Sequence, residues 1–549
     1  MKPSGWLVLL ACAAWLSAST VLAEQESPPP VFGEELEVRV VNFEVVVTDR
    51  KGNRVSGLKP EDFRLRVDGK EVPVEYFTEV KEGRAVTPAG SDPAKAESGA
   101  APGVGPEGVV PTWYLVFIDD FFSYGPYRDT VLKALKDDLA RLAPEDRMAI
   151  VAYDGGRLSI VSNWSGSRNA LERAFDEAMA RPSRGAHRIT ELRSFLNDEG
   201  FARQVVGDEQ PLDLNANNPG LNEREYAFAD TLVRQVQGAV GATVSAMRGF
   251  GGPEGRKVLL LLSGGWPFSP QGYVKPGVIP TRSLKDAEEL FRPLTSTANL
   301  LGYTIYPVDV PGLQTLAADA TAEAPGAETF NLREQEIEGS VEYIAKQTGG
   351  RPLMDTYRTA VLDRASSDTR SYYWLGFSPD WKRNDKSHKV KVEVRRAGLE
   401  ARSRTGFLDL SRKAEGSMKV ESALLFGNMP GAVPIPMRLG PPERPKKGTG
   451  VAVPVTLGLP AELMTMVPVN GKYSAQLELR FAASDSEGNG SDIPVLPITL
   501  TSDKPPAPGK MIKYKTTLTL RGKADRLVVA VYDPLSGRIA TAEAKIEAH

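Results

Sequence analysis

Hydrophobic and polar residues alternate with a period of two in residues 35–80. The alternating runs are interrupted by short turns rich in Asp and Gly, at 49–52 and 68–69. Alternation broken by such turns is typical of β-hairpins. This segment has too few strands to close a sandwich alone, so we expect it to pair with strands from elsewhere in the chain.

The pattern changes in residues 111–365, where continuous apolar runs alternate with segments of helical periodicity. The apolar runs predict buried strands, at Trp113–Ile118, Met148–Tyr153, Lys257–Leu262 and Tyr303–Val308. The helical segments are Leu132–Leu142, Leu171–Ala178, Tyr226–Val244, Leu284–Leu294 and Val341–Ala345. Strands and helices that alternate in this order predict a parallel sheet covered by helices. Residues 181–222 have weak periodicity and are expected to form an insertion loop.

Strand-like alternation returns in residues 370–410. The expected strands are Tyr372–Phe377, Lys389–Arg395 and Leu399–Phe407, and they lack partners just as residues 35–80 do. We therefore expect both segments to form one β-sandwich into which the α/β domain is inserted, because insertion is tolerated where the ends of a loop lie close together. Two separate β-extensions are the alternative. Tyr372 and Trp374 would share one face of their strand, and packing of one face into a core is expected.

Residues 413–549 predict a second β unit, for which a small immunoglobulin-like sandwich fits. Its expected strands include Ala423–Phe426, Tyr473–Phe481, Ile512–Leu520 and Arg526–Tyr532. The predicted fold class is thus multidomain, α/β plus all-β. The predicted parts are a signal peptide at 1–23, one half of the sandwich at 35–80, a flexible Ala/Gly/Pro/Ser linker at 81–110, the α/β domain at 111–365, the other half of the sandwich at 366–412, and the C-terminal sandwich at 413–549.

Residues 1–23 have the pattern of a secretory signal. Lys2 is followed by the apolar segment Trp6–Trp15 and by Val21-Leu22-Ala23, a small-residue cleavage site. An uncleaved membrane anchor is the alternative. Cys12 is the only cysteine, so the mature chain would be exported without disulfides. We expect a periplasmic or extracellular protein with no membrane span after cleavage.

The composition of the chain disfavours nucleic-acid binding and the usual hydrolytic activities. The formal net charge is −3, so no electrostatic footprint for nucleic acid is visible. Only three histidines are present, and no Gly-x-Ser-x-Gly motif occurs, which disfavours the usual hydrolytic enzymes. We expect His187 to lie in a loop and His388 to be a turn residue before a strand.

The candidate chemistry lies directly after the strand Trp113–Ile118. This strand delivers Asp119, Asp120 and Ser123 to its C-terminal end, where open α/β sheets bind their ligands. Hard cations take oxygen ligands of this kind, so the loop is a candidate site for Mg²⁺ or Mn²⁺. The alternative is that the two carboxylates cap the following helix or are solvated. Asp309 ends a further strand at the same edge.

Residues 35–410 resemble the von Willebrand factor A-related proteins found mainly in acidobacteria and related lineages. The resemblance is carried by Val46-Val47-Thr48-Asp49, Gly57-Leu58, Glu61-Asp62-Phe63, Tyr306-Pro307-Val308-Asp309, Ala345-Lys346-Gln347-Thr348-Gly349-Gly350 and Tyr372-Tyr373-Trp374-Leu375-Gly376-Phe377. It implies a secreted protein whose A-domain has a Rossmann-like sheet used for adhesion and assembly.

The resemblance also implies a metal-ion-dependent adhesion site, but a degenerate one. In A-domains the site uses Asp-x-Ser-x-Ser, a Thr from a second loop and an Asp from a third. Asp119 matches the first Asp and Ser123 the last Ser, whereas Phe121 replaces the middle Ser. Thr190 is the nearest candidate for the Thr, and Gly264 stands where the third-loop Asp would be.

The function predicted from these residues is that of an exported, non-enzymatic binding protein. An unidentified protein partner would dock at the sheet edge formed by Asp119, Asp120, Ser123, Ser263-Gly264-Gly265 and Asp309, with or without a cation. The alternative is a structural scaffold of an envelope assembly, in which the β domains make the contacts and no metal is bound.

Overall fold

The computed structural model describes residues 40–86, 104, 108–188, 190–191, 219–251, 255–270, 285–310, 339–354, 361–411, 414, 416–417, 420, 424, 433–443, 450–469, 471–484, 490–492, 495–521 and 526–546. The predicted signal at 1–23 and most of the predicted linker lie outside the described residues. The start of that linker is not loop, however, because β4 (Tyr76–Lys81) forms a hairpin with β5 (Arg84–Val86).

A five-stranded sheet forms the centre of the α/β part, in the order β10-β9-β6-β7-β8. Its strands are β6 (Thr112–Asp119), β7 (Arg147–Tyr153), β8 (Leu158–Ser165), β9 (Arg256–Ser263) and β10 (Tyr303–Asp309). Strands β6, β7, β9 and β10 run parallel, as the sequence predicts, and β8 pairs antiparallel with β7. The sequence did not predict β8, because its residues are half-buried without alternation.

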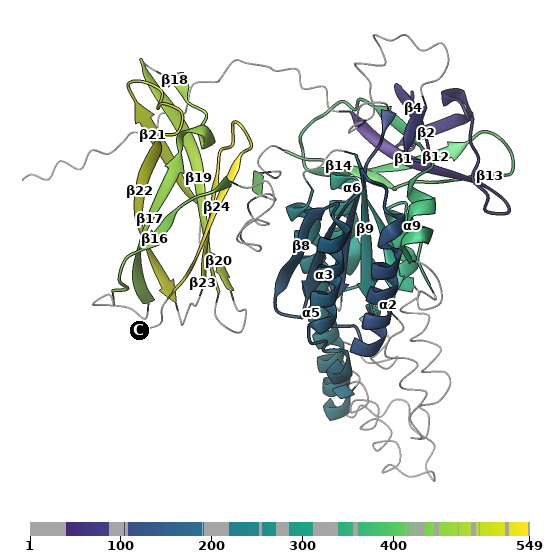
Figure 1. Cartoon of the computed structure of the whole chain (residues 1–549), viewed down its shortest axis with the longest axis horizontal. Coiled ribbons are helices and arrows are strands. Elements are labelled where there is room, and N and C mark those ends of the chain that lie inside the picture. Colours follow the sequence, from purple (N-terminus) through teal and green to yellow (C-terminus); the bar gives the residue numbers. More distant parts are fainter. Residues whose placement is uncertain are drawn as a thin grey trace, which may run out of the picture. The chain divides into compact units, whose positions relative to one another are not determined.

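Helices cover both faces of this sheet (Figure 1). They are α2 (Gly125–Asp137), the 3-10 turn η3 (Asp138–Arg141), α3 (Arg168–Ala180), α5 (Pro219–Gly249), α6 (Ala287–Leu301) and α9 (Val361–Thr369), and residues 339–347 are also helical. Tyr114, Val116 and Ile118 of β6 pack with α2, α3 and α9, whereas Leu115 and Phe117 pack with α5 and α6. Alternate residues of β6 thus fill two cores, which places the C-terminal end of this strand between the two helical layers.

The two alternating segments share a pair of β-sheets. One sheet has the order β13-β1-β11-β4-β5 and the other β14-β12-β2-β3. The elements not yet given are β1 (Val41–Asp49), η1 (Pro60–Asp62), β2 (Phe63–Val67), β3 (Lys70–Val72), β11 (Tyr372–Phe377), β12 (Lys386–Val394), β13 (Leu399–Arg402) and β14 (Gly406–Asp409). Val45 pairs with Tyr373 and Leu65 with Val392, so the pairing expected between the segments is present.

Two details of these sheets differ from the sequence predictions. The expectation that β11 buries one face is wrong, because all its residues are buried. Tyr373 and Leu375 belong to the core between the sheets, whereas Tyr372 and Trp374 pack on the other side with Val80. His388 is not a turn residue before a strand but lies inside β12, where its ring stacks on Phe407.

The C-terminal β unit has two sheets around one apolar core, in the orders β15-β24-β23-β19-β18 and β16-β17-β22, and β20 and β21 pair with β19. Its elements are β15 (Val433–Pro434), β16 (Met437–Leu439), β17 (Gly450–Pro460), η5 (Ala461–Leu463), β18 (Val467–Val469), β19 (Lys472–Ser484), β20 (Gly490–Asp492), β21 (Leu496–Ser502), β22 (Met511–Arg521), β23 (Arg526–Tyr532) and β24 (Ile539–Lys545). The strand predicted at Ala423–Phe426 is wrong, because Leu424 is helical. Val420 and Leu424, four residues apart, lie on one helix face and pack with Tyr532.

Within the described part of the chain, no helix is both long enough and apolar enough to cross a membrane.

Candidate functional site

Asp119 ends β6 and is fully buried. One carboxylate oxygen accepts hydrogen bonds from Ser263 Oγ at 2.8 Å and from the Trp266 indole nitrogen at 2.7 Å. The other accepts from the backbone N–H groups of Phe121 and Phe122, at 3.2 and 3.1 Å. Four donors therefore surround this carboxylate. Burial nevertheless raises the pKa of Asp119 to about 6, because it removes the charged form from water.

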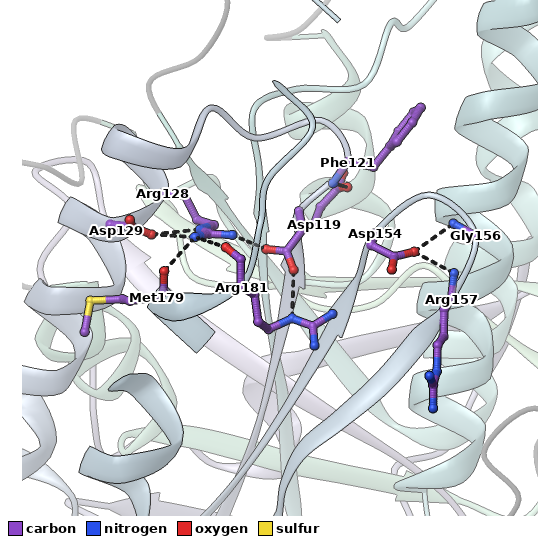
Figure 2. A network of polar contacts seen from close by, with 10 residues as sticks. Asp119, Phe121, Arg128, Asp129, Asp154, Gly156, Arg157, Met179 and Arg181 are labelled. Atoms are coloured by element: carbon purple, nitrogen blue, oxygen red, sulfur yellow. Dashed lines mark hydrogen bonds and ion pairs between the residues drawn. The ribbon is translucent and has the colours of Figure 1, made fainter. Parts of the chain in front are cut away.

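Asp120 is also fully buried, and two arginines bind its carboxylate. Arg128 Nη1 lies 2.6 Å from one carboxylate oxygen, and Arg181 Nε lies 3.0 Å from the other. Arg128 is also bonded to Asp129 and to the Met179 carbonyl, as Figure 2 shows. Burial raises the pKa of Asp120, and the two guanidinium groups oppose the rise. The charge of Asp120 is thus neutralised inside the protein.

Ser123 lies one turn further along the same loop and is fully buried. Its backbone N–H donates to the Asp119 carbonyl at 3.2 Å. Its hydroxyl has no hydrogen-bond partner among the described residues. Of the three side chains that the sequence brings to this loop, only Ser123 keeps an unused oxygen.

Three glycines from three other segments close over residues 119–124. A Cβ atom on Gly264 would lie 2.3 Å from the Phe122 carbonyl oxygen, and one on Gly185 would lie 2.2 Å from the Ser123 carbonyl oxygen. A Cβ on Gly155 would lie 2.3 Å from the Phe121 ring. Gly264 and Gly185 are therefore required by close approach of the backbone, whereas Gly155 has a φ of +97°, which L side chains rarely adopt. This explains why the position expected for the third-loop Asp is occupied by Gly264.

In this arrangement the carboxylate oxygens expected to hold Mg²⁺ or Mn²⁺ bind protein donors instead. Mg²⁺ is octahedral and is held by at least one or two protein carboxylates with water in the other positions, whereas the carboxylates of Asp119 and Asp120 accept from six protein donors in total. Thr190 does not point toward them, because it is exposed and its hydroxyl donates to the Ala186 carbonyl at 3.1 Å. Among the described residues, no group of three or more His, Cys, Asp or Glu side chains is placed to hold a metal ion.

The remaining edge residues lie where the sequence places them. Asp309 ends β10 and pairs with Ser263 at the end of β9. Gly265 follows, with its N–H donating to Ser263 Oγ at 3.3 Å. Ser263, Gly265 and Asp309 are partly exposed. The structure therefore brings Asp119, Asp120, Ser123 and Ser263-Gly264-Gly265 together, but as a closed and largely buried group.

The sequence did not reveal the residues whose side chains donate to the Asp119 and Asp120 carboxylates. Trp266 is buried and stacks on Phe291, and its place two residues after Gly264 was the available signal. Arg128 is a buried cation on α2, and Arg181 ends α3. Nothing in the sequence shows that both reach Asp120, because their approach depends on how α2 and α3 pack.

The accessible surface above the buried acids is aromatic and basic. Phe121 and Tyr124 are partly exposed, and Arg184 is exposed. The buried Arg188 packs against Phe121, with its guanidinium 5.5 Å from the ring centre. The Arg184 backbone N–H donates to the Asp120 carbonyl at 2.7 Å, so this loop is fixed to the buried pair.

No protein-family model and no curated protein matches the chain. Among solved structures, the pilus adhesin SpaC from Lactobacillus rhamnosus GG is 9% identical with a TM-score of 0.21, over 79% of this chain and 56% of that one. A β-glucosidase from Kluyveromyces marxianus is 13% identical with a TM-score of 0.13, over 60% of this chain and 34% of that one. The chain thus spans about half of the adhesin and about a third of the glucosidase. At these TM-scores neither match establishes a shared fold.

Proposed function

We propose that this chain is an exported, non-enzymatic binding protein whose protein partner docks over the C-terminal edge of the β10-β9-β6-β7-β8 sheet. The proposal treats the α/β part as an A-type domain with a degenerate metal site, as the sequence resemblance implies. The export rests on the pattern of residues 1–23. The docking surface consists of Phe121, Tyr124, Arg181 and Arg184, and no cation takes part.

One observation carries this proposal: the segments bonded to the buried carboxylates bear partly exposed aromatic side chains and the exposed Arg184. Asp119 fixes Ser263 and Trp266 at the end of β9, and Asp120 fixes Arg181. Rigid side chains lose little conformational entropy on binding, and aromatic residues and Arg are enriched at interfaces. A loop set fixed in this way is suited to binding.

The charge of the surface favours an acidic partner. The Arg181 side chain is 22% exposed and uses Nε for Asp120, which leaves the outer nitrogens of its guanidinium to receive a carboxylate. Arg184 is exposed beside it. In adhesion sites of the metal-dependent kind, a cation receives the partner's carboxylate. In this proposal the guanidinium groups have that role.

The experiment compares partner capture by the full chain and by two variants. Arg184→Glu combined with Phe121→Ala should reduce capture from envelope and culture fractions by at least about tenfold, since hot-spot residues each contribute more than about 1 kcal/mol. Arg173→Glu is the matched control, because Arg173 is exposed on α3, away from this edge. Equal capture by both variants and by the unchanged chain would contradict the proposal.

A second candidate, a structural scaffold with contacts made by the β domains, is favoured by the position of exposed apolar side chains. Of the five large hydrophobic residues exposed in the described part, four lie in the C-terminal unit: Val433, Val495, Met511 and Leu535. Deletion of 413–549 would then abolish assembly, and the double variant at Phe121 and Arg184 would not.

A further inference from the structure

A second buried charge cluster lies between α9, β10 and the strands of the split sandwich. Asp368 on α9 is its centre and is almost fully buried. Its carboxylate accepts from the Tyr306 hydroxyl at 2.6 Å, from Arg402 Nη2 at 2.6 Å and from Arg54. Arg351 Nε lies 3.7 Å away. Three arginines therefore converge on one carboxylate.

Two further arginines extend the cluster. Arg256 is fully buried and lies 3.4 Å from the Glu44 carboxylate. Arg404 is buried and, among the described residues, donates to the backbone carbonyls of Asn299, at 2.5 Å, and of Asn42. The five guanidinium groups thus outnumber the two carboxylates, Glu44 and Asp368, by three.

Several donors of this cluster have no acceptor. Arg54 Nη1, Arg402 Nη1, Arg404 Nε and Arg256 Nε are buried without a hydrogen-bond partner among the described residues. A buried donor left without an acceptor costs roughly 1–3 kcal/mol. Burial and the neighbouring arginines also lower the pKa of Arg351 and Arg402. Positive charge and hydrogen-bonding capacity are both in excess.

Three arginines of this cluster, Arg351, Arg402 and Arg404, line a pocket of about 490 Å³. Residues 342–352 form one wall, and β12 and β13 with the segment after them form the other. Its cationic lining residues are Lys346, Arg351, Lys391, Arg402 and Arg404, and Glu342 is its one acidic lining residue. Lys391 is paired with Glu393 at 2.7 Å, whereas Lys346 is exposed and has no ion-pair partner within the described residues.

We propose that this pocket binds a small oxyanion that carries at least two negative charges, and that Lys346, Arg351 and Arg402 are its ligands. A planar guanidinium donates two parallel hydrogen bonds to a phosphate or carboxylate group, and Lys supplies a point charge. The anion would lower the repulsion among the arginines. Because the pocket walls come from residues 342–352 and from β12 and β13, the anion would also bridge the α/β part and the split sandwich.

This inference is independent of the proposed docking surface, which uses other residues. The test is calorimetric titration of the full chain with pyrophosphate and, in parallel, with citrate, at constant ionic strength in chloride. Saturable binding of one or both is expected, and the stronger of the two identifies the anion as a phosphate ester type or a polycarboxylate type. Absence of saturable binding by both probes would overturn the proposal.

Variants locate the bound anion. Lys346→Gln and Arg402→Gln should each weaken binding by about tenfold or more, which is the effect of losing one charged ligand. Lys346 is exposed, so its replacement leaves the fold intact even if Arg402→Gln does not fold. Arg173→Gln is the matched control and should bind as the unchanged chain does. Binding that Lys346→Gln and the control retain equally would overturn the assignment of this pocket.

Discussion

The two buried charge clusters of this protein differ in how completely their groups are paired. At the end of β6, Asp119 has four donors and Asp120 has two guanidinium partners. At the cluster around Asp368, four arginines share two carboxylates, Arg404 donates to backbone carbonyls, and several N–H groups lack acceptors among the described residues. Burial is common to both clusters, so burial does not distinguish them. The clusters are distinguished by the excess of guanidinium groups over carboxylates at the second. This excess points to a ligand at the second cluster, whereas the complete pairing at the first points to loop anchoring.

The largest expected effect comes from breaking the second cluster at its centre. Asp368→Asn removes the charge that holds Arg54 and Arg402, and it leaves like charges buried together. Removing one partner of a buried ion pair costs about 3–5 kcal/mol, so we expect a loss of that size in the free energy of unfolding, measured by urea denaturation.

The control for this change is Asp363→Asn on the same helix. Asp363 is paired with Arg141 at 2.6 Å, but both side chains are more than half exposed. Exposed pairs contribute about 0–1 kcal/mol. If the two variants lost equal stability, Asp368 would not be the centre of the cluster.

The first cluster should be visible in the pH dependence of stability. The pKa of Asp119 is about 6 in the folded protein, above its ordinary value of 3.8. The folded state then binds this proton more tightly than the unfolded state does. Protonated Asp119 therefore stabilises the folded state by on the order of 3 kcal/mol. This stabilisation is complete below about pH 4 and is lost as the pH rises toward 6.

Asp119→Asn provides the comparison, because an amide does not titrate. Burial also raises the pKa of Asp120, Asp138 and Asp146, so the quantity to measure is the difference in slope between the two proteins. The unchanged chain should lose more stability between pH 4 and pH 6 than the variant does. Parallel stability curves would show that Asp119 has an ordinary pKa.

Closure of the sheet edge can be tested at Gly264. Gly264→Ala places a methyl group against the Phe122 carbonyl oxygen, a backbone atom that cannot move without shifting the loop. Overpacking of this kind costs about 1–3 kcal/mol. Gly241→Ala is the opposite case, because its Cβ would meet nothing within 4 Å on exposed helix surface, and it should raise stability by about 1 kcal/mol. Thermal unfolding of both variants measures the contrast.

Much of the fold follows from periodicity, whereas the state of the candidate site does not. The apolar run of β6, the helix expected around Leu284–Leu294 and the pairing of the two alternating segments all agree with the pattern of the sequence. The helical Leu424 and the two buried faces of β11 were predicted wrongly, because tertiary packing decides both. The same holds for the site: Asp119 and Asp120 were found as residues, but Arg128 and Trp266, which neutralise and fix them, come from distant segments whose approach no local pattern encodes.

The smallest expected effect is at Ser123, and it separates loop anchoring from metal binding. The Ser123 hydroxyl is buried and has no hydrogen-bond partner among the described residues, so Ser123→Ala removes an unsatisfied polar group. We expect its stability to change by less than about 1 kcal/mol, in the direction of a gain. A hydroxyl that served as a cation ligand would give the opposite result, because Mg²⁺ would then raise the melting temperature of the unchanged chain and not that of the variant. Melting both proteins with Mg²⁺ and with a chelator measures this. Equal melting temperatures in the two conditions are expected, because the carboxylates that would complete a cation site are already bonded to Ser263, Trp266 and the two arginines.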